Sequence, residues 1–310
     1  MHRYRVVFMG TPEFAVPSLD ALARTEEVVL VVTNPDRPAG RGQALTAPPV
    51  KREAQRLGIP VFQPEKARGP ESVARIAGER PELIVVVAYG QILPPSILDI
   101  PKYGCINVHA SLLPRYRGAA PINWAIARGE TVTGVTIMKM DPGMDTGPML
   151  HVREMPIGED DTAETMFPKL SSLGAQALGE ALGKLREGTL AEIPQDGSRA
   201  TYAPMIKKEH GRIEWGKSAR EVRDLVRGMT PWPSAFTDHD GKALKVLAAS
   251  VREDKGRPGE ILSVDRDGIV VGCGEGALLL CKVQPEGGRA MSSREYAQGR
   301  RVRKGDRLSP

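Results

Sequence analysis

The chain has 310 residues, of which 41% are hydrophobic and 26% charged, and this composition excludes a disordered or fibrous protein. Its formal net charge is +5, and its three cysteines are too few and too scattered for a disulfide scaffold or a four-ligand zinc site. No apolar run reaches the length of about 18 residues that a membrane span needs, and the N-terminus lacks the pattern of a signal or transit peptide. We therefore expect a cytoplasmic protein with no membrane partner and no metal.

Near-continuous apolar runs mark the strands expected in the first part of the chain, at residues 6–9, 28–32 and 83–88. Such runs are typical of parallel strands that are buried on both faces. Helical patterns at residues 50–57 and 71–79 lie between them. The alternation predicts an α/β domain with a Rossmann-like parallel sheet and right-handed crossovers.

The residues Gly10 to Phe14 form a turn after the first predicted strand. This turn lacks the G-x-G-x-x-G spacing of a dinucleotide site, and the chain contains no G-x-x-x-x-G-K-[ST] motif. A simple tight turn is therefore favoured over a phosphate-binding loop.

Residues 34–49 interrupt the α/β scheme, because they contain four prolines and two glycines. We expect no helix or strand in such a segment. Connections of this length are usually functional or mobile. Arg37 and Arg41 lie near its middle, and arginine binds phosphate in a bidentate manner. The alternative is a tolerated surface insertion.

The remaining pattern divides the chain into two predicted domains. Strands at residues 105–109 and 133–138 and a long helix at 162–186 complete the first domain, residues 1–188. A polar segment interrupted by proline and glycine, residues 189–206, is expected to be a linker. The last domain, residues 207–310, contains short strand patterns at residues 244–248, 259–263, 269–272 and 277–281. Such a pattern predicts a small β-barrel or sandwich. Of the two we expect a small β-barrel of the OB type.

Basic residues are concentrated in this last domain. From Lys207 onward, 21 lysines and arginines stand against 15 acidic residues, a balance of +6, whereas the first 206 residues have a balance of −1. A basic excess favours a polyanion as partner. A solvated basic face without a partner is the alternative.

Asn107 and His109 are the most informative polar residues of the predicted strands. They are two residues apart and therefore project from the same face, near the end of the strand. Ligands of open α/β sheets bind beyond the carboxyl ends of the strands. An amide donor beside an imidazole suits a reaction that builds an oxyanion and then transfers a proton. A hydrogen-bonded structural histidine is the alternative.

A carboxylate would complete this pair, since a carboxylate beside an imidazole fixes its orientation and supports its charge. Asp145 lies in a glycine-rich loop after the next strand, and Asp141 precedes it by four residues. Spacing does not decide between the two.

The motifs around these residues resemble those of a known family. The run from Asn107 to Gly118 is similar to the signature of the 10-formyltetrahydrofolate-dependent formyltransferases, and Asp145-Thr146-Gly147 is similar to their second motif. Three further features resemble the members whose acceptor is a methionyl initiator tRNA: Gly10-Thr11-Pro12-Glu13-Phe14, the loop at residues 35–42, and the basic last domain with Pro231-Trp232-Pro233.

The resemblance implies the transfer of a formyl group from N10 of 10-formyltetrahydrofolate, used as a co-substrate, to the amino group of methionyl initiator tRNA. It implies that Asn107 and His109 stabilise the tetrahedral oxyanion and assist proton transfer, and that Asp145 orients His109. The first domain would then be the folate-binding catalytic domain and the last a tRNA-binding domain. We expect a monomer.

The resemblance also implies where the substrates bind. The folate would lie along the strand ends, with Ser111, Leu112, Leu113 and Pro114 forming part of the wall. A loop after another strand is expected to line the pteridine pocket through its backbone, at Tyr89, Gly90, Gln91 and Ile92. The expected tRNA contacts are Arg37 and Arg41 in the long loop, which in the family enters the acceptor stem, and Lys207 and Lys208 at the end of the linker.

Two alternatives to this function remain. The first is a folate-dependent formyltransferase that acts on a nucleotide-sugar or a purine-precursor amine, although a small acceptor would not need the last third of the chain. The second is a catalytically silent, folate-sensing tRNA-binding protein, which would have no need of Asn107, His109 and Asp145 together.

Overall fold

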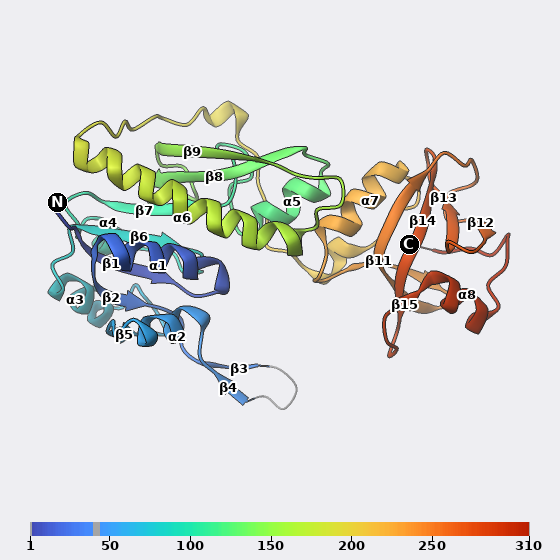
Figure 1. Ribbon diagram of the computed structural model, residues 1–310, viewed down its shortest axis with the longest axis horizontal. Helices are drawn as coiled ribbons and strands as arrows, with labels where there is room; N and C mark the ends of the chain where they lie inside the picture. The colour runs from blue at the N-terminus through green and yellow to red at the C-terminus, as the bar shows by residue number, and fades with distance from the viewer. Residues whose placement is uncertain (1, 40–43, 310) are drawn as a thin grey trace. The chain divides into compact units, whose positions relative to one another are not determined.

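The computed structural model describes residues 2–39 and 44–309, and their contacts divide the chain into two units (Figure 1). Unit 1 comprises Met1–Gly118, Thr133–Met155 and Phe167–Tyr202, and unit 2 comprises Ala119–Val132, Pro156–Met166 and Ala203–Pro310. Two short segments that precede residue 188 thus belong to unit 2 by their contacts. The linear boundaries at residues 188 and 206 stay a prediction for the functional domains.

Unit 1 is built around a seven-stranded sheet with the order β5-β2-β1-β6-β7-β8-β9. Its strands are β1 Arg5–Gly10, β2 Glu27–Val32, β5 Val61–Phe62, β6 Leu83–Val87, β7 Cys105–His109, β8 Val132–Lys139 and β9 Met149–Pro156. The neighbours from β5 to β7 pair in parallel, whereas β8 is antiparallel to β7. The predicted Rossmann-like parallel sheet is confirmed, and the antiparallel addition at one side is common in such sheets.

Several helices of this fold begin with proline, whose fixed φ and missing N–H fit the first helical turn. The helices around the sheet are α1 Val16–Thr25, α2 Pro49–Arg56, α3 Pro70–Gly78, α4 Pro95–Leu98 and α6 Ala163–Glu187. Within the described part of the chain, no helix has the length and apolarity needed to cross a lipid bilayer.

Both faces of the parallel strands are covered by side chains from helices. On one face, Val7 and Val86 belong to a buried cluster with Ile76 of α3 and Ile97 of α4. On the other face, α6 approaches β7 so closely that a Cβ atom on Gly174 would lie 2.8 Å from Val108 Cγ1. This two-sided burial explains why the strand sequences are continuously apolar.

The expectation that residues 34–49 form neither helix nor strand is wrong for part of the segment. β3 Arg37–Ala39 pairs antiparallel with β4 Ala44–Thr46, with Pro38 opposite Leu45, and α2 begins at Pro49. Both strands of a two-stranded ribbon are edge strands, and an edge strand tolerates a proline that cannot donate a hydrogen bond. Arg41 lies outside the described residues.

Unit 2 contains an antiparallel sheet with the order β10-β11-β14-β13-β12, and β15 pairs with β14. Its elements are α5 Pro121–Ala127, α7 Ala219–Gly228, β10 Ala235–His239, β11 Lys242–Arg252, β12 Ile261–Val264, β13 Ile269–Gly272, β14 Ala277–Pro285, β15 Met291–Ser292 and α8 Ser293–Arg300. The chain's last residues bond to both edges of the sheet, since Ser309 bridges Asp238 and Leu308 N donates to Gly259 O at 2.8 Å. The sheet thus closes through isolated bridges, as in the small barrel predicted.

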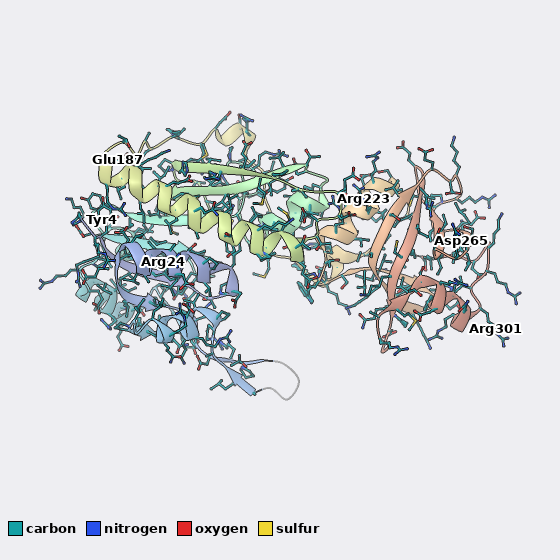
Figure 2. The ribbon with its side chains drawn as sticks, in the orientation of Figure 1. Tyr4, Arg24, Glu187, Arg223, Asp265 and Arg301 are labelled. Carbon is teal, nitrogen blue, oxygen red and sulfur yellow. The ribbon has the colours of Figure 1, made fainter. Side chains whose placement is uncertain are left out.

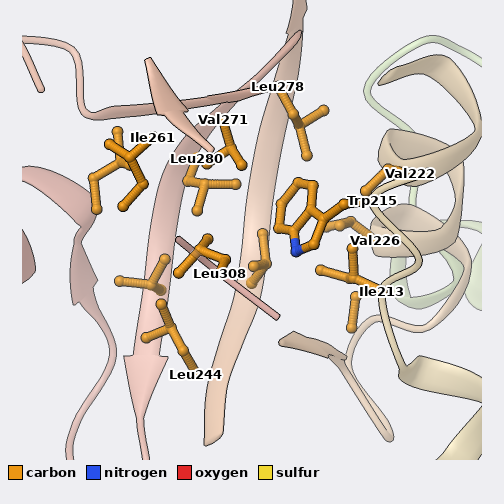
Figure 3. Close-up of a cluster of buried hydrophobic side chains, with 14 of the residues drawn as sticks. Ile213, Trp215, Val222, Val226, Leu244, Ile261, Val271, Leu278, Leu280 and Leu308 are labelled. Atoms are coloured by element: carbon orange, nitrogen blue, oxygen red, sulfur yellow. The ribbon is translucent and has the colours of Figure 1, made fainter. Parts of the chain in front are cut away.

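The core of unit 2 surrounds Trp215 (Figure 3). Val222 and Val226 of α7 and Leu278 of β14 are buried in the same cluster. The indole Nε1 donates to Thr237 Oγ1 at 3.0 Å, so the one polar atom of this side chain is satisfied. The cluster ties α7 to the sheet and gives unit 2 a core of its own.

Two alanine substitutions in α6 test its packing on β7. A Cβ atom on Gly179 meets nothing within 4 Å, so Gly179→Ala should stabilise unit 1 by about 0.5–1 kcal/mol through helix propensity. Gly174→Ala gains the same propensity but overpacks the core against Val108, at a cost of about 1–3 kcal/mol. We expect the midpoint of urea unfolding to rise for Gly179→Ala and not for Gly174→Ala. An equal rise in both variants would contradict the close packing of α6 on β7.

Candidate active site

β7 brings Asn107 and His109 to one face of the sheet, near the end of the strand. Ile106 and Val108, which alternate with them, are buried on the opposite face at 2% and 3% exposure. Because α6 fixes that opposite face through Gly174, the strand cannot rotate the polar pair into the core. The predicted orientation of Asn107 and His109 follows from this alternation.

The imidazole of His109 lies between two hydrogen-bond acceptors. Its Nε2 is 3.0 Å from the carbonyl oxygen of Tyr116, and its Nδ1 is 3.7 Å from Oδ2 of Asp145. The side chain is 6% exposed, so water screens these contacts little. Nε2 is therefore within hydrogen-bond distance of its acceptor, whereas Nδ1 and the Asp145 carboxylate are close enough for electrostatic attraction but not for a direct hydrogen bond.

The carboxylate of Asp145 is itself held in place. Its Oδ2 accepts a hydrogen bond from Gly118 N at 2.8 Å. Asp145 and Tyr116 both have positive φ, 53° and 60°, a conformation that costs free energy in residues with a Cβ atom. The two residues that flank the His109 ring are thus strained, and the surrounding contacts must hold them there.

The structure separates the two candidate carboxylates. Asp141 closes its own loop, because its Oδ1 accepts hydrogen bonds from Gly143 N at 3.1 Å and Thr146 Oγ1 at 2.7 Å. A Cβ atom on Gly147 would lie 1.9 Å from Lys139 O, so only glycine lets the loop return this closely along β8. Asp145, and not Asp141, faces His109.

Asn107 is half-buried and retains its hydrogen-bonding capacity. Among the residues that the structure describes, no protein group bonds to its side-chain amide. The amide therefore remains available to donate to a bound ligand, as an oxyanion donor must be.

The segment Ser111 to Pro114 is fixed by a residue that the sequence analysis missed. Thr136 Oγ1 in β8 donates to Ser111 O at 2.7 Å and accepts from Leu113 N at 3.2 Å. Ser111 Oγ donates to Arg115 O at 2.7 Å, so its side chain serves the turn. Thr136 lies between the apolar residues Val135 and Ile137, and a polar residue at such a position was the signal that could have indicated this role.

In the loop after β6, some of the predicted pteridine contacts are used within the protein and others are exposed. Tyr89 is buried at 2% exposure, burial raises its pKa to about 12, and its carbonyl accepts from Asn34 Nδ2 at 3.0 Å. The Gln91 amide is used by Asn34 and Ala67. Ile92 is 86% exposed. Of the predicted pteridine contacts, the side chain of Ile92 and the backbone around Gly90 remain open to a ligand.

The base of the β3–β4 hairpin is held by hydrogen bonds to residues that follow β2 and β5 and to α2. Hydrogen bonds from Gln63 and Lys51 hold the pKa of the Asp36 carboxyl below its usual range, and Gln63 also donates to Asn34 O at 2.9 Å. Arg37 pairs with Glu65 at 3.0 Å, with both side chains well exposed. The hairpin therefore emerges from a fixed base.

The tRNA contacts predicted in unit 2 lie at its surface. Lys207 Nζ lies 3.7 Å from Glu209, and both side chains are 66% exposed. Lys208 is exposed. Acidic and basic side chains such as Asp265 and Arg301 both project from unit 2 (Figure 2). The polyanion partner stays a prediction.

Comparison with known proteins agrees with this architecture. A sequence model described as formyl transferase matches residues 4–182, and one described as the C-terminal domain of formyl transferase matches residues 205–301. The methionyl-tRNA formyltransferase of Geobacter metallireducens is 53% identical over 304 residues, which covers 98% of each chain. That of Geobacter sulfurreducens is 55% identical over 305 residues, covering 98% of this chain and 96% of the relative.

A solved structure shares the fold at low identity. It is the N-formyltransferase from Helicobacter canadensis in complex with folinic acid and dTDP-3-aminofucose, with a TM-score of 0.65 and 17% identity, covering 89% of this chain and 98% of that one. The fold is that of a two-part α/β transferase, and an imidazole–carboxylate pair lies at the end of β7. The chain belongs to the formyl transferase family, and the resemblance inferred from its motifs is confirmed.

Cys105 lies on the same face as Asn107 and His109, but its thiol is not a nucleophile. Burial raises the pKa of Cys105 to about 12 and that of Cys273 to about 11, whereas Cys281 is half-buried. Since the thiolate is the reactive form, a disulfide reagent at pH 8 should modify Cys281 and spare Cys105 in the native protein. Mass spectrometry after timed labelling measures this, with urea-unfolded protein as the control. Labelling of Cys105 as fast as Cys281 would contradict its burial.

Proposed function

We propose that this enzyme transfers the formyl group of 10-formyltetrahydrofolate to the free amino group of methionyl initiator tRNA. The observation that carries the proposal is the Asn107 amide, to which no group of the described residues bonds, on the same strand as a His109 ring held between Tyr116 O and Asp145. The full-length similarity to enzymes named methionyl-tRNA formyltransferase supports this acceptor. The matched C-terminal domain, which includes the basic excess from Lys207 onward, supports it too.

The residues at the strand ends fit a folate-derived formyl donor. The Asn107 amide is available, Ile92 offers an exposed apolar side chain, and Thr136 holds the wall from Ser111 to Pro114 in place. When bound, the donor would supply the electrophilic formyl carbon. Asn107 would then donate to the formyl oxygen as negative charge develops on it.

The His109–Asp145 pair would assist the proton transfers by which the attacking amine loses its proton. A free α-amino group has a pKa of about 7.7–8.0, and esterification of its carboxyl lowers that value, so the nucleophile is largely neutral at physiological pH. A strongly basic residue is therefore not required. Asp145 orients the imidazole and supports the charge that it gains.

The two parts of the chain divide the work in this proposal. Residues 1–188 form the catalytic, folate-binding domain, residues 189–206 connect the domains, and residues 207–310 bind tRNA, with Lys207 and Lys208 at the start. We propose that the protein acts as a monomer in the cytoplasm.

The choice of acceptor can be tested with one assay. Purified protein and 10-formyltetrahydrofolate carrying a labelled formyl group are incubated with methionyl initiator tRNA, with uncharged tRNA, or with small amines such as an amino sugar nucleotide. We expect label to transfer to the charged tRNA. Preferential transfer to a small amine would establish a different acceptor, and folate and tRNA binding without transfer would indicate a catalytically silent protein.

Substitutions in the site should separate its roles. Asn107→Ala removes the oxyanion donor and should lower kcat by roughly 10²–10³ with folate affinity retained. Asp145→Asn keeps the shape but loses the charge, and it should lower kcat far more than Asp141→Asn. Single-turnover kinetics with a folate-binding measurement checks both. Normal turnover in Asn107→Ala, or a larger loss in Asp141→Asn, would assign the roles to other residues.

We propose that the long loop, residues 34–49, contacts the acceptor end of the tRNA. Arg41→Leu should then reduce kcat/KM for methionyl-tRNA more than tenfold, about 1.4 kcal/mol of transition-state stabilisation, with folate affinity unchanged. Arg24→Leu on α1 (Figure 2) is the matched control, because Arg24 is an exposed arginine outside the loop. An equal loss in folate binding would make the loop a lid over the folate, and no loss would make it a surface insertion.

A further inference from the structure

Gln195 lies in the segment that follows α6, for which the sequence suggests only a linker. The structure holds this segment against unit 1, because the backbone N–H and C=O of Ile193 bond to those of Met149 at 2.8 Å each. Gln195, two residues later, is half-buried. Its position is therefore fixed by the edge of the sheet rather than free to follow a flexible connection.

Both polar atoms of the Gln195 side chain are used. Nε2 donates to Asp145 O at 2.8 Å and to Gly147 O at 2.7 Å. Oε1 accepts from Arg117 Nε at 3.1 Å and from Arg117 Nη2 at 2.7 Å. An exchange of the amide oxygen and nitrogen would set donors against donors and acceptors against acceptors. The network thus admits one orientation of the amide.

The two segments that Gln195 joins are the two that flank the His109 ring. Tyr116 O faces Nε2 and Asp145 faces Nδ1, while Gly118 N bonds to the Asp145 carboxylate. Arg117 lies between Tyr116 and Gly118 and is 6% exposed, so its guanidinium needs a buried acceptor. Gln195 supplies that acceptor and ties the arginine to the backbone of the 145–147 loop.

Asp145 depends on this tie because its backbone is strained. A residue with a φ of 53° stays there only when its surroundings fix it. The bonds from Gln195 Nε2 hold the carbonyl of Asp145 itself and that of Gly147, on either side of Thr146. Their loss would let the carboxylate move away from His109 without removing any group that touches a substrate.

We propose that Gln195 is a positioning residue, which sets the geometry of the His109–Asp145 pair by joining the 116–118 turn to the 145–147 loop. This inference rests on the proposed formyl transfer for its kinetic readout. A displacement of a reacting group by about 1 Å can cost about 10²-fold in rate. The effect on kcat is therefore expected to exceed the effect on binding.

Three variants of the full chain test the proposal. Gln195→Leu removes all four hydrogen bonds. Gln195→Glu keeps an acceptor for Arg117 and so retains the hydrogen bonds to the 116–118 turn. It sets an oxygen against the carbonyls of Asp145 and Gly147 and so loses the hydrogen bonds to the 145–147 loop. Gln176→Leu is the control, since Gln176 is exposed on α6.

We expect Gln195→Leu and Gln195→Glu to lower kcat by roughly 10–100-fold, with KM for both substrates and folate affinity within about twofold. Gln195→Glu should keep the melting temperature closer to wild type, because its charge pairs with Arg117. In an Asp145→Asn background, Gln195→Leu should cost little more, since the carboxylate it positions is already gone. A wild-type kcat in Gln195→Glu, or a full multiplicative loss in the double variant, would overturn the proposal.

A second measurement keeps this inference separate from the choice of acceptor. If the wild-type protein failed to formylate methionyl-tRNA, the proposed function would be wrong. Rates of formyl transfer could then not test the role of Gln195. The imidazole ¹⁵N resonances of protein labelled at its five histidines report the His109 hydrogen bonds without any substrate. Gln195→Leu and Gln195→Glu should shift the His109 signals, and Gln176→Leu should not. Unshifted signals in both Gln195 variants would overturn the positioning role.

Discussion

The site depends on one arrangement, a buried imidazole held between a backbone carbonyl and a carboxylate. His109 Nε2 lies at hydrogen-bond distance from the carbonyl of Tyr116, Nδ1 lies 3.7 Å from the carboxylate of Asp145, and burial keeps water from competing for these contacts. Both neighbours have strained backbones, so the arrangement exists only because other contacts impose it. The packing of α6 through Gly174 fixes β7, Gly147 lets the loop return along β8, and Gln195 joins the two flanking segments. These three contacts lie outside the imidazole–carboxylate pair, yet each helps to fix the position of His109 or of Asp145.

Much of the fold could be predicted from the sequence because unit 1 follows simple burial rules. The run Leu83–Val87 is buried on both faces, and its continuous apolar sequence predicts a parallel strand. The β3–β4 hairpin was missed because proline at position 38 argues against a strand, whereas a two-stranded ribbon tolerates it. For unit 2 the sequence predicted a small barrel, but not the contacts that close its sheet. It depends on bonds such as that of Leu308 to Gly259, between segments that are far apart in the sequence and carry no local signal.

Some features of the candidate site could likewise be predicted from the sequence, and others could not. The spacing of Asn107 and His109 predicted their common face, because alternation along a strand is a local property. The choice between Asp141 and Asp145 needed the conformation of a loop, in which Asp141 bonds to Gly143 and Thr146. The role of Tyr116 was not predictable, since its contribution is a backbone carbonyl that any residue possesses. Gln195 was missed because a single amide in an irregular segment is typical of a solvated linker, and its significance comes only from the four partners that the fold brings to it.

A double-mutant cycle tests whether His109 and Asp145 act as one unit. Single-turnover rates of formyl transfer are compared for His109→Gln, Asp145→Asn and the double variant, at saturating concentrations of both substrates. Residues that act as a unit show strongly non-additive losses. The account predicts that the double variant is about as slow as the slower single variant. Losses that multiply would show that the two residues contribute independently, and would contradict the account.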